Sequence, residues 1–259
     1  MRPYATAQNT GTRDTQCDAT AVHTAPSGAR AYVLLDGIGS SDAIRAWTIK
    51  AARRVARAAS RRADAEAGLR HVYGDYAADP GRQDPYELRW MPKAAVVVAV
   101  AVPGQPLRVA WAGDCRAYLL VRGIARRLTN DHNDRRVHPP TAMYPAGGDR
   151  NLITSYLGGV DDDEDLRRMF GHPVIESVTV PLDGQCRLLL ASDGAYEPHV
   201  DAGHDLYAEL DDDPLTRVAQ EFVDLAVETS LRATVTAGQG GVWSRPYADN
   251  ATVLLADLN

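Results

Sequence analysis

Four apolar segments of the sequence each carry an aspartate at one end, and this repeated pattern constrains the fold more than any other feature. The aspartates are Asp36, Asp114, Asp193 and Asp249, and each stands beside a glycine or an asparagine. One such pair is typical of a turn, because Asp, Asn and Gly accept turn conformations readily. Four of them indicate a shared sheet edge where carboxylates converge. Converged carboxylates cannot all stay ionised without a cation among them.

The first of these segments, Ala31–Ser41, indicates how such an aspartate is placed in a site. An isolated Asp-Gly pair after a strand is most often a hairpin turn. Here residues 42–62 repeat apolar side chains at three- and four-residue spacing, which predicts a helix and not a returning strand. Ser40 or Ser41 can cap that helix. Asp36 is therefore expected at a strand–loop–helix corner, from which it can project into a site.

A dinucleotide-binding turn is the first alternative for Gly37-Ile38-Gly39, but parts of that motif are missing. The third glycine position holds Asp42, and no second strand ending in an acid follows about 20 residues on. A metal site with oxygen ligands fits better, because aspartates suit Mg²⁺ or Mn²⁺ and no Cys/His set suggests zinc. Two such ions roughly 3.5–4 Å apart would make a bridging water a nucleophile for displacement at phosphorus.

Size and composition favour one soluble domain spanning residues 1–259. The chain is 45% hydrophobic and 24% charged, and no Pro/Gly/Ser-rich linker divides it. The start lacks an apolar signal core, and no run approaches the roughly 20 apolar residues of a membrane span. A net charge of −6 argues against nucleic-acid binding. Three cysteines without metal-like spacing favour a reduced, cytoplasmic setting.

Hydrophobic periodicity predicts many short strands and two helical blocks. Strands are expected at 18–23, 31–35, 94–102, 107–112, 116–121, 125–128, 174–180, 186–191 and 251–258. Helices are expected at 42–60, at about 63–76, and from Asp213 to about Arg232. Residues 1–12 are expected to be a flexible start, 79–93 a connection, and 133–171 a mobile insertion. This order favours an α+β fold with helices packed on an antiparallel sandwich over a doubly wound parallel sheet.

Seven motifs, in this order, make the chain resemble the metal-dependent protein phosphatases of the type 2C (PPM) family, in particular its single-domain bacterial members. They are RDTQCD at 13–18, LLDGIG at 34–39, VAWAGDCRAYLL at 109–120, LTNDH at 128–132, NLITSYLGG at 151–159, LLLASDGAYE at 188–197 and DNATVLL at 249–255. The resemblance implies a four-layer α/β/β/α sandwich of two antiparallel sheets with a two-metal centre in a cleft at one end. It also implies hydrolysis of phosphoserine and phosphothreonine in proteins by a metal-activated water.

The resemblance further implies which residues hold the two ions, which would be Mn²⁺ or Mg²⁺. Asp36 would bridge both ions, and the Gly37 carbonyl would bind one of them. Asp193 and Asp249 would hold the other ion. Asp18 would bind an ion through a water molecule.

Three more features are assigned by the resemblance. A weaker third ion would lie at Asp114 and at Glu197, which stands where the family usually has an aspartate. Arg13 would grip the substrate phosphate through two parallel hydrogen bonds. The unperiodic 133–171 stretch would be the variable flap beside the active site. The expected partner is a phosphorylated protein, a target of a serine/threonine kinase, and the chain is expected to be a monomer.

The sequence departs from the family pattern at several positions. Gln16-Cys17 replaces an Asn-Glu or Asn-Gln pair, and Ile38 stands where many eukaryotic members have a histidine proposed as the general acid. Bacterial members often have an apolar residue at the latter position. The irregular block around Cys17 motivates the alternative that the chain is a catalytically weak, phosphatase-fold binding or regulatory protein.

The histidines of the sequence suggest structural roles. His132 is expected to pack locally, because a lone histidine is rarely a ligand. The other positions considered show no shared spacing; they are His71, His138, His172, His199 and His204.

Overall fold

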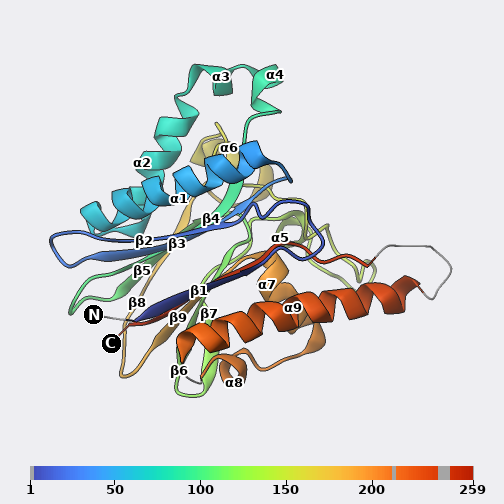
Figure 1. The fold of residues 1–259 in the computed structure, drawn as a ribbon. Helices are drawn as coiled ribbons and strands as arrows, with labels where there is room; N and C mark the ends of the chain where they lie inside the picture. The colour runs from blue at the N-terminus through green and yellow to red at the C-terminus, as the bar shows by residue number, and fades with distance from the viewer. Residues whose placement is uncertain (1–2, 212–213, 239–245, 259) are drawn as a thin grey trace.

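The computed structural model describes residues 3–211, 214–238 and 246–258 (Figure 1). Its strands are β1 Tyr4–Asn9, β2 Ala19–Thr24, β3 Arg30–Gly37, β4 Ala94–Ala101, β5 Leu107–Ala112, β6 Arg116–Val121, β7 Ile124–Arg127, β8 Glu176–Val180, β9 Arg187–Ala191 and β10 Ala251–Asp257. Its helices are α1 Asp42–Arg62, α2 Ala65–Ala77, α3 Pro80–Gln83, α4 Pro85–Leu88, α5 Asp134–Val137, α6 Asp163–Phe170, α7 Asp193–Ala202, α8 Leu206–Leu210 and α9 Leu215–Gly238. Every strand expected from periodicity is present within two residues of its expected bounds.

The strands form two five-stranded sheets in which all paired neighbours are antiparallel. One sheet has the order β1-β10-β9-β6-β7 and the other β2-β3-β4-β5-β8. In the first sheet, β1 pairs with β10, so that Tyr4 lies opposite Ala256 and Asn9 opposite Ala251. This pairing of the first and last strands brings the segment after β1 next to the segment before β10.

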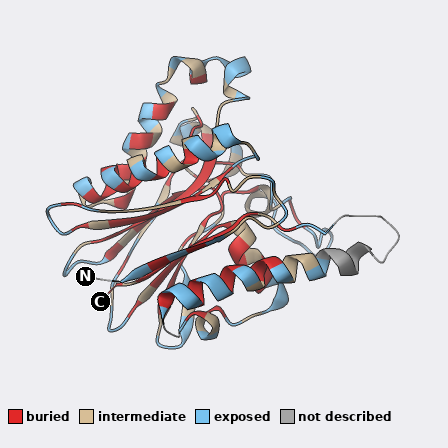
Figure 2. Cartoon of the chain, viewed as in Figure 1, coloured by how far each residue is buried: buried red, intermediate tan, exposed pale blue. Residues whose placement is uncertain are grey.

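The two sheets pack face to face, and helices cover their outer faces (Figure 1). Leu34 and Val97 from one sheet and Leu190 and Leu254 from the other belong to the apolar core between them. The strand β4 is buried at every residue, as expected for a strand covered on both faces. Figure 2 shows the buried residues concentrated along the strands and the inner sides of the helices. The predicted four-layer α/β/β/α sandwich is confirmed.

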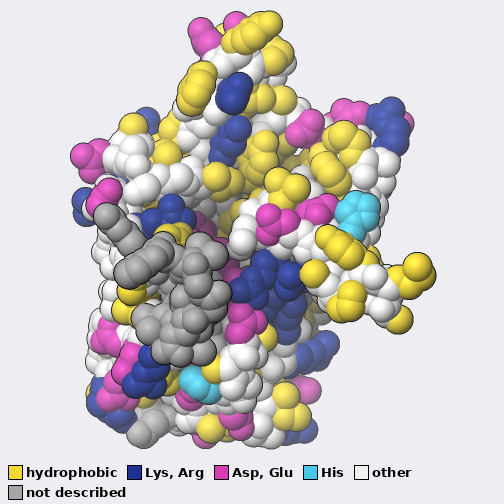
Figure 3. All heavy atoms as spheres, turned by 90° about the vertical axis from the view of Figure 1, so that its right-hand side faces the viewer, with side chains coloured by type: hydrophobic (Ala, Val, Ile, Leu, Met, Phe, Trp, Pro, Cys, Tyr) yellow, Lys and Arg dark blue, Asp and Glu magenta, His cyan; other side chains and the backbone are white. Residues whose placement is uncertain are grey.

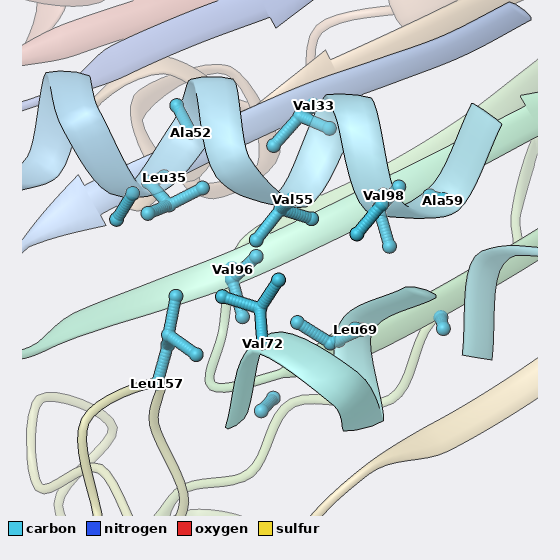
Figure 4. Close-up of a cluster of buried hydrophobic side chains, with 14 of the residues drawn as sticks. Val33, Leu35, Ala52, Val55, Ala59, Leu69, Val72, Val96, Val98 and Leu157 are labelled. Carbon is cyan, nitrogen blue, oxygen red and sulfur yellow. The ribbon is translucent and has the colours of Figure 1, made fainter. Parts of the chain in front are cut away.

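A second apolar core lies between β3, β4 and the helices α1 and α2 (Figure 4). Val33 and Leu35 are two positions apart on β3, so they point to the same face of the sheet and meet Val55 of α1. At Gly68 of α2 an added Cβ atom would lie 2.3 Å from the Cα atom of Ala59 on α1. Glycine at position 68 therefore allows the two helices to approach closely. This packing fixes the position of α1, which begins directly after the Asp36 corner.

The predictions for the start of the chain and for the last helix differ from the structure in part. Residues 1–12 were expected to be a flexible start, but residues 4–9 form the edge strand β1. The polar side chains that suggested a loose segment belong to the exposed face of this strand, which alternates with buried Ala5 and Ala7. Asp213, the expected start of the last helix, lies outside the described residues. That helix, α9, continues to Gly238, beyond the expected end near Arg232.

Helices α7 and α8 were not predicted. Pro198 lies inside α7 and lacks an N–H group, and Gly194 is in its first turn, so the local sequence resembles a turn. The stretch 133–171 is largely irregular, as expected, apart from the short helices α5 and α6. Within the described residues, no helix combines the length and apolar character needed to cross a membrane.

Candidate metal centre and active site

Asp36 is the penultimate residue of β3, and the next position, 37, has room only for glycine. A Cβ atom added at Gly37 would lie 2.6 Å from the Cys17 carbonyl oxygen and 2.8 Å from the Thr48 hydroxyl of α1. The backbone after Asp36 is therefore packed tightly between the N-terminal segment and α1. The predicted strand–loop–helix corner is present, with Ser41 as the helix cap accepting a hydrogen bond from the Ile44 N–H.

Asp193 and Asp249 lie at the same edge of the other sheet. Asp193 is the first residue of α7, and one residue separates it from the end of β9. Asp249 likewise lies one residue away from the start of the neighbouring strand β10. Ser192 joins the two segments, since its N–H donates to the Thr252 carbonyl at 3.0 Å and its hydroxyl accepts from the Thr252 N–H at 3.0 Å. The register of β9 and β10 therefore holds the two aspartates side by side.

These strand ends surround a cavity of about 330 Å³. It is lined by Arg13, Asp36, Gly37, Ile38, Gly39, Asp114, Asn151, Ile153, Asp193, Tyr247, Asp249 and Asn250. The structure thus brings together most of the site residues predicted from the sequence. Asp18 stands behind this lining, close enough for its charge to raise the pKa of Asp36.

Several buried carboxylate oxygens at the cavity lack hydrogen-bond partners among the described residues. Asp18 and Asp114 are each 3% exposed, and both Asp18 oxygens and the Asp114 Oδ1 atom accept no hydrogen bond from a described residue. Burial raises the pKa of Asp18 to about 8. Burial, followed by the charges of neighbouring carboxylates, also raises the pKa of Asp36, Asp114 and Asp193. A divalent cation would supply both the missing partners and the missing charge, so this donor set fits a metal centre with oxygen ligands.

Arg13 reaches the cavity but is paired in this structure. Its Nε and Nη2 atoms donate to the two oxygens of Asp249 at 2.8 and 2.6 Å. The hydroxyl of Tyr247 donates to the same carboxylate at 2.9 Å, and the Arg13 guanidinium lies 5.3 Å from the Tyr247 ring centre. The Asp249 hydrogen bond raises the pKa of Arg13, which keeps it charged. Arg13 therefore presents a fixed cation at the rim of the carboxylate cluster.

Glu197, expected at a third ion, is not part of the cavity lining that contains Asp36. It lies one turn along α7 from Asp193 and forms an ion pair with Arg150 at 3.1 Å. Arg150 also pairs with Asp201 at 2.8 Å. Burial and the charge of Asp193 raise the pKa of Glu197 to about 7, although Arg150 opposes the rise.

The two unusual residues of the sequence occupy different places. Cys17 is 1% exposed, and its N–H donates to the Asn250 side chain at 2.8 Å, so it packs beneath the cavity as a structural residue. Ile38 is 40% exposed and lies in the cavity wall. An apolar side chain at this position cannot donate a proton.

Reasoning from the sequence missed three features near this end of the molecule. Tyr247 lines the cavity, but no motif indicates it. A neighbouring cavity of about 350 Å³ is lined by five arginines from distant segments, Arg116, Arg127, Arg135, Arg136 and Arg150. Figure 3 shows Lys and Arg side chains gathered in the middle of one face and bordered by Asp and Glu. Finally, His199 and His204 lie close to Glu209. The spacing of the histidines in the sequence does not predict this contact, which depends on the turn between α7 and α8.

Solved structures of bacterial phosphatases share this fold. PppA, a key regulatory component of T6SS in Pseudomonas aeruginosa, has 18% identity and a TM-score of 0.67 over 98% of this chain and 96% of its own. The PPM Ser-Thr phosphatase MsPP from Mycobacterium smegmatis has 19% identity and a TM-score of 0.67 over 99% and 98%. The Mycobacterium tuberculosis serine/threonine phosphatase PstP/Ppp has 21% identity and a TM-score of 0.63 over 100% and 99%. A comparison with curated protein sequences finds no match.

The sequence itself matches a family model as well. Residues 40–136 match the model of the family described as Protein phosphatase 2C. This part of the chain, which includes two of the seven motifs, is similar to the protein phosphatase 2C family. The resemblance inferred from the seven motifs is therefore confirmed. The family-model match, together with the shared fold, supports metal-dependent dephosphorylation of proteins on serine and threonine.

Proposed function

We propose that this type 2C phosphatase hydrolyses phosphoserine and phosphothreonine in proteins with Mn²⁺ or Mg²⁺ held by the carboxylates of its cavity. The observation that supports this proposal most directly is the set of buried carboxylate oxygens without protein partners. Asp36 and Asp193 come from opposite sheets and face the same cavity, where Asp18 lies behind them. A structural acidic cluster would be expected to have hydrogen-bond donors of its own.

The family resemblance assigns each carboxylate a role, and the position of each in the structure is compatible with it. Asp36, near the end of β3, would bridge two ions, and the carbonyl of the next residue, Gly37, would bind one of them. Asp193 and Asp249 would hold one ion from the β9–β10 edge, and Asp18 would act through water. When bound, such ions neutralise phosphate charge and lower the pKa of a bound water so that it can attack phosphorus.

Arg13 would orient the phosphate. Its planar guanidinium matches two phosphate oxygens, and its pairing with Asp249 keeps it at the cavity rim before substrate arrives. Ile38 offers no proton in the cavity wall, so a histidine-assisted route is not available at that position. A third ion at Asp114 and Glu197 would require Glu197 to leave Arg150. This contact supports weaker binding at the third position.

The decisive experiment measures hydrolysis of p-nitrophenyl phosphate and of a phosphothreonine peptide with and without Mn²⁺, in the wild-type protein and in Asp193→Ala. Both substrates should be hydrolysed only with metal, and the variant should lose this activity. Asp183→Ala is the matched control, because Asp183 lies in an exposed turn away from the cavity. Metal-dependent activity that persists in Asp193→Ala would contradict the assigned site.

Calorimetry separates this enzyme from the alternative of a phosphatase-fold binding protein. Binding of Mn²⁺ together with hydrolysis would support the enzyme. Absence of both at millimolar metal would indicate a binding protein. The natural substrate, its kinase, the cytoplasmic location and the monomeric state stay predictions from the sequence.

A further inference from the structure

We propose that His199, His204 and Glu209 form a second metal site, for a divalent transition-metal ion that accepts nitrogen ligands, foremost Zn²⁺. These three residues, the His199 site, lie outside the carboxylate cavity. His199 is on α7, His204 follows the αL residue Gly203 that ends α7, and Glu209 is on α8. One ligand atom from each of the three residues lies within 4.8 Å of the other two.

The separations between these atoms approach those of a metal site. The Nδ1 atoms of His199 and His204 are 3.2 Å apart, and the His204 Nδ1 atom is 3.1 Å from a Glu209 oxygen. Ligands about 2.0–2.1 Å from a tetrahedral ion are about 3.3 Å from one another. The third separation, 2.6 Å between His199 Nδ1 and the other Glu209 oxygen, is shorter.

The tautomer of His199 leaves its Nδ1 atom unprotonated and able to bind a metal ion. The Nε2 atom lies 3.0 Å from the Phe222 carbonyl oxygen, which only accepts hydrogen bonds, so Nε2 carries the proton. The ring also stacks on Phe222 with centres 3.8 Å apart, which fixes its orientation. In neutral His199 the Nδ1 lone pair therefore faces His204 and Glu209. In a metal-ligating histidine, the ring nitrogen that does not bind the metal usually donates its proton to such an acceptor.

Glu209 supplies an independent observation. Its Oε2 atom is buried and has no hydrogen-bond partner among the described residues, although His199 Nδ1 is close. A buried carboxylate oxygen beside a nitrogen lone pair is repulsive unless a cation lies between them. A metal ion bound by both atoms would remove this repulsion, and metal titration tests for it.

The backbone holds these ligands rigidly. The His204 N–H donates to the His199 carbonyl at 2.9 Å, and Asp205 caps α8 by accepting from the N–H groups of Tyr207 and Ala208. Leu206 and Leu210 of α8 are buried against the core below α9. A bound ion would therefore cross-link α8 to α7. Asp193, the first residue of α7, lies about 9 Å from His199 along the helix axis.

The two metal sites are expected to select different ions. The cavity offers only oxygen ligands, which suit Mg²⁺ and Mn²⁺, whereas two imidazoles and a carboxylate suit Zn²⁺ and Co²⁺. Excess Mg²⁺ should therefore occupy the cavity and leave the His199 site for Zn²⁺.

The test titrates Zn²⁺ by calorimetry into full-length, chelator-treated protein in excess Mg²⁺, and repeats the titration with Co²⁺ while recording the visible spectrum. One Zn²⁺ should bind per chain, and Co²⁺ should give the strong absorption of a four-coordinate nitrogen-ligated ion. His204→Ala and Glu209→Gln, both at partly exposed positions, should weaken Zn²⁺ binding more than about 100-fold and abolish the Co²⁺ band. His138→Ala is the matched control, because His138 is exposed and its side chain pairs with Asp134, away from the His199 site. Circular dichroism checks that each variant is folded.

Several outcomes would overturn the proposal. No stoichiometric Zn²⁺ binding in excess Mg²⁺ would mean that the three residues do not form a metal site. Binding that survives in His204→Ala and disappears in Asp193→Ala would place the ion in the cavity. Because neither measurement depends on phosphatase activity, failure of the proposed function leaves this test unaffected.

Discussion

The turn at Gly113 and Asp114 separates two buried polar clusters that are bonded in opposite ways. On one side, Asp114 joins the carboxylates of the cavity, where buried oxygens lack hydrogen-bond partners. On the other side, His132 exchanges hydrogen bonds with Gly113 through its N–H and its Nδ1 atom. His132 also stacks on His172 at 4.1 Å and bonds to Glu176 at 3.1 Å.

The ring nitrogens of His132 and His172 each have a hydrogen-bond partner. His172 is bonded at 2.8 Å to the Thr154 hydroxyl through Nε2 and at 2.8 Å to the Pro173 carbonyl through Nδ1. Arg136 donates two hydrogen bonds to Glu176, at 2.7 and 2.9 Å. Burial would raise the pKa of Glu176, but these partners lower it to about 2. Satisfied groups of this kind stabilise the fold, whereas the unsatisfied carboxylates require a ligand to complete them.

The largest expected effect comes from Asp36→Asn. Activity with Mn²⁺ should fall by roughly 10²–10³-fold, the order expected when one group that organises transition-state charge is lost. The metal-free protein should instead become more stable, because a neutral amide removes the burial penalty and the charge repulsion that raise the pKa of Asp36. Steady-state kinetics and urea unfolding in chelator measure the two effects.

Glu176→Gln is the matched acid-to-amide control on the other side of the turn. It should destabilise the protein by about 1–3 kcal/mol, because Arg136 and His132 lose a charged partner. If both variants changed stability in the same direction, the distinction between an unsatisfied and a satisfied cluster would be wrong.

Arg13→Ala should lower kcat/KM by about 10–100-fold, the value of a charge-assisted hydrogen bond to phosphate. Arg13 also pairs with Asp249, so its loss could act on metal binding alone. Inorganic phosphate distinguishes these possibilities, because its inhibition constant at saturating Mn²⁺ should rise only if Arg13 binds phosphate. Arg13→Lys keeps the charge without the planar fork and should recover part of the activity. An unchanged phosphate inhibition constant in Arg13→Ala would limit the residue to holding Asp249.

The carboxylate cavity could be predicted from the sequence because its ligands come from strand ends. Strand positions follow from a two-residue period, and an aspartate beside glycine or asparagine marks one end of each of the four apolar runs. Thus Asp36, Asp114, Asp193 and Asp249 were expected together before their topology was known, and the structure gathers them. The family motifs added Asp18 and Arg13, whose local sequence carries no such signal.

The histidine contacts could not be predicted in the same way. His132 and His172 are forty residues apart and meet only because an irregular segment folds back between them. His199 and His204 are close in sequence, but their contact depends on the αL conformation of Gly203 and on α8, which was not expected. Arg13 lies in the cavity lining, and its pairing with Asp249 depends on the β1–β10 register. Such contacts depend on tertiary packing more than on local pattern.

The smallest expected effect is a loss of stability in acid, and it tests the satisfied cluster directly. Burial lowers the pKa of His172 from its ordinary value of 6.5 to about 4, so the folded state holds this ring neutral. A lowered pKa means that its stabilising contribution is complete above pH 6.5 and is lost as pH falls toward 4. Glu176 follows at lower pH, between 4.5 and about 2. Between pH 7 and pH 4.5 the unfolding free energy should therefore fall by about 1–3 kcal/mol from His172.

Urea unfolding across this pH range, with His172→Gln beside the exposed control His138→Gln, isolates the contribution. His172→Gln should flatten the profile between pH 6.5 and 4, because an amide can keep a hydrogen bond to Thr154 without a proton to gain. The control should keep the wild-type slope, since His138 is 68% exposed. An equal slope in both variants would mean that His172 is protonated as readily in the folded state as in the unfolded chain. The contrast between the two clusters would then rest on the cavity carboxylates alone.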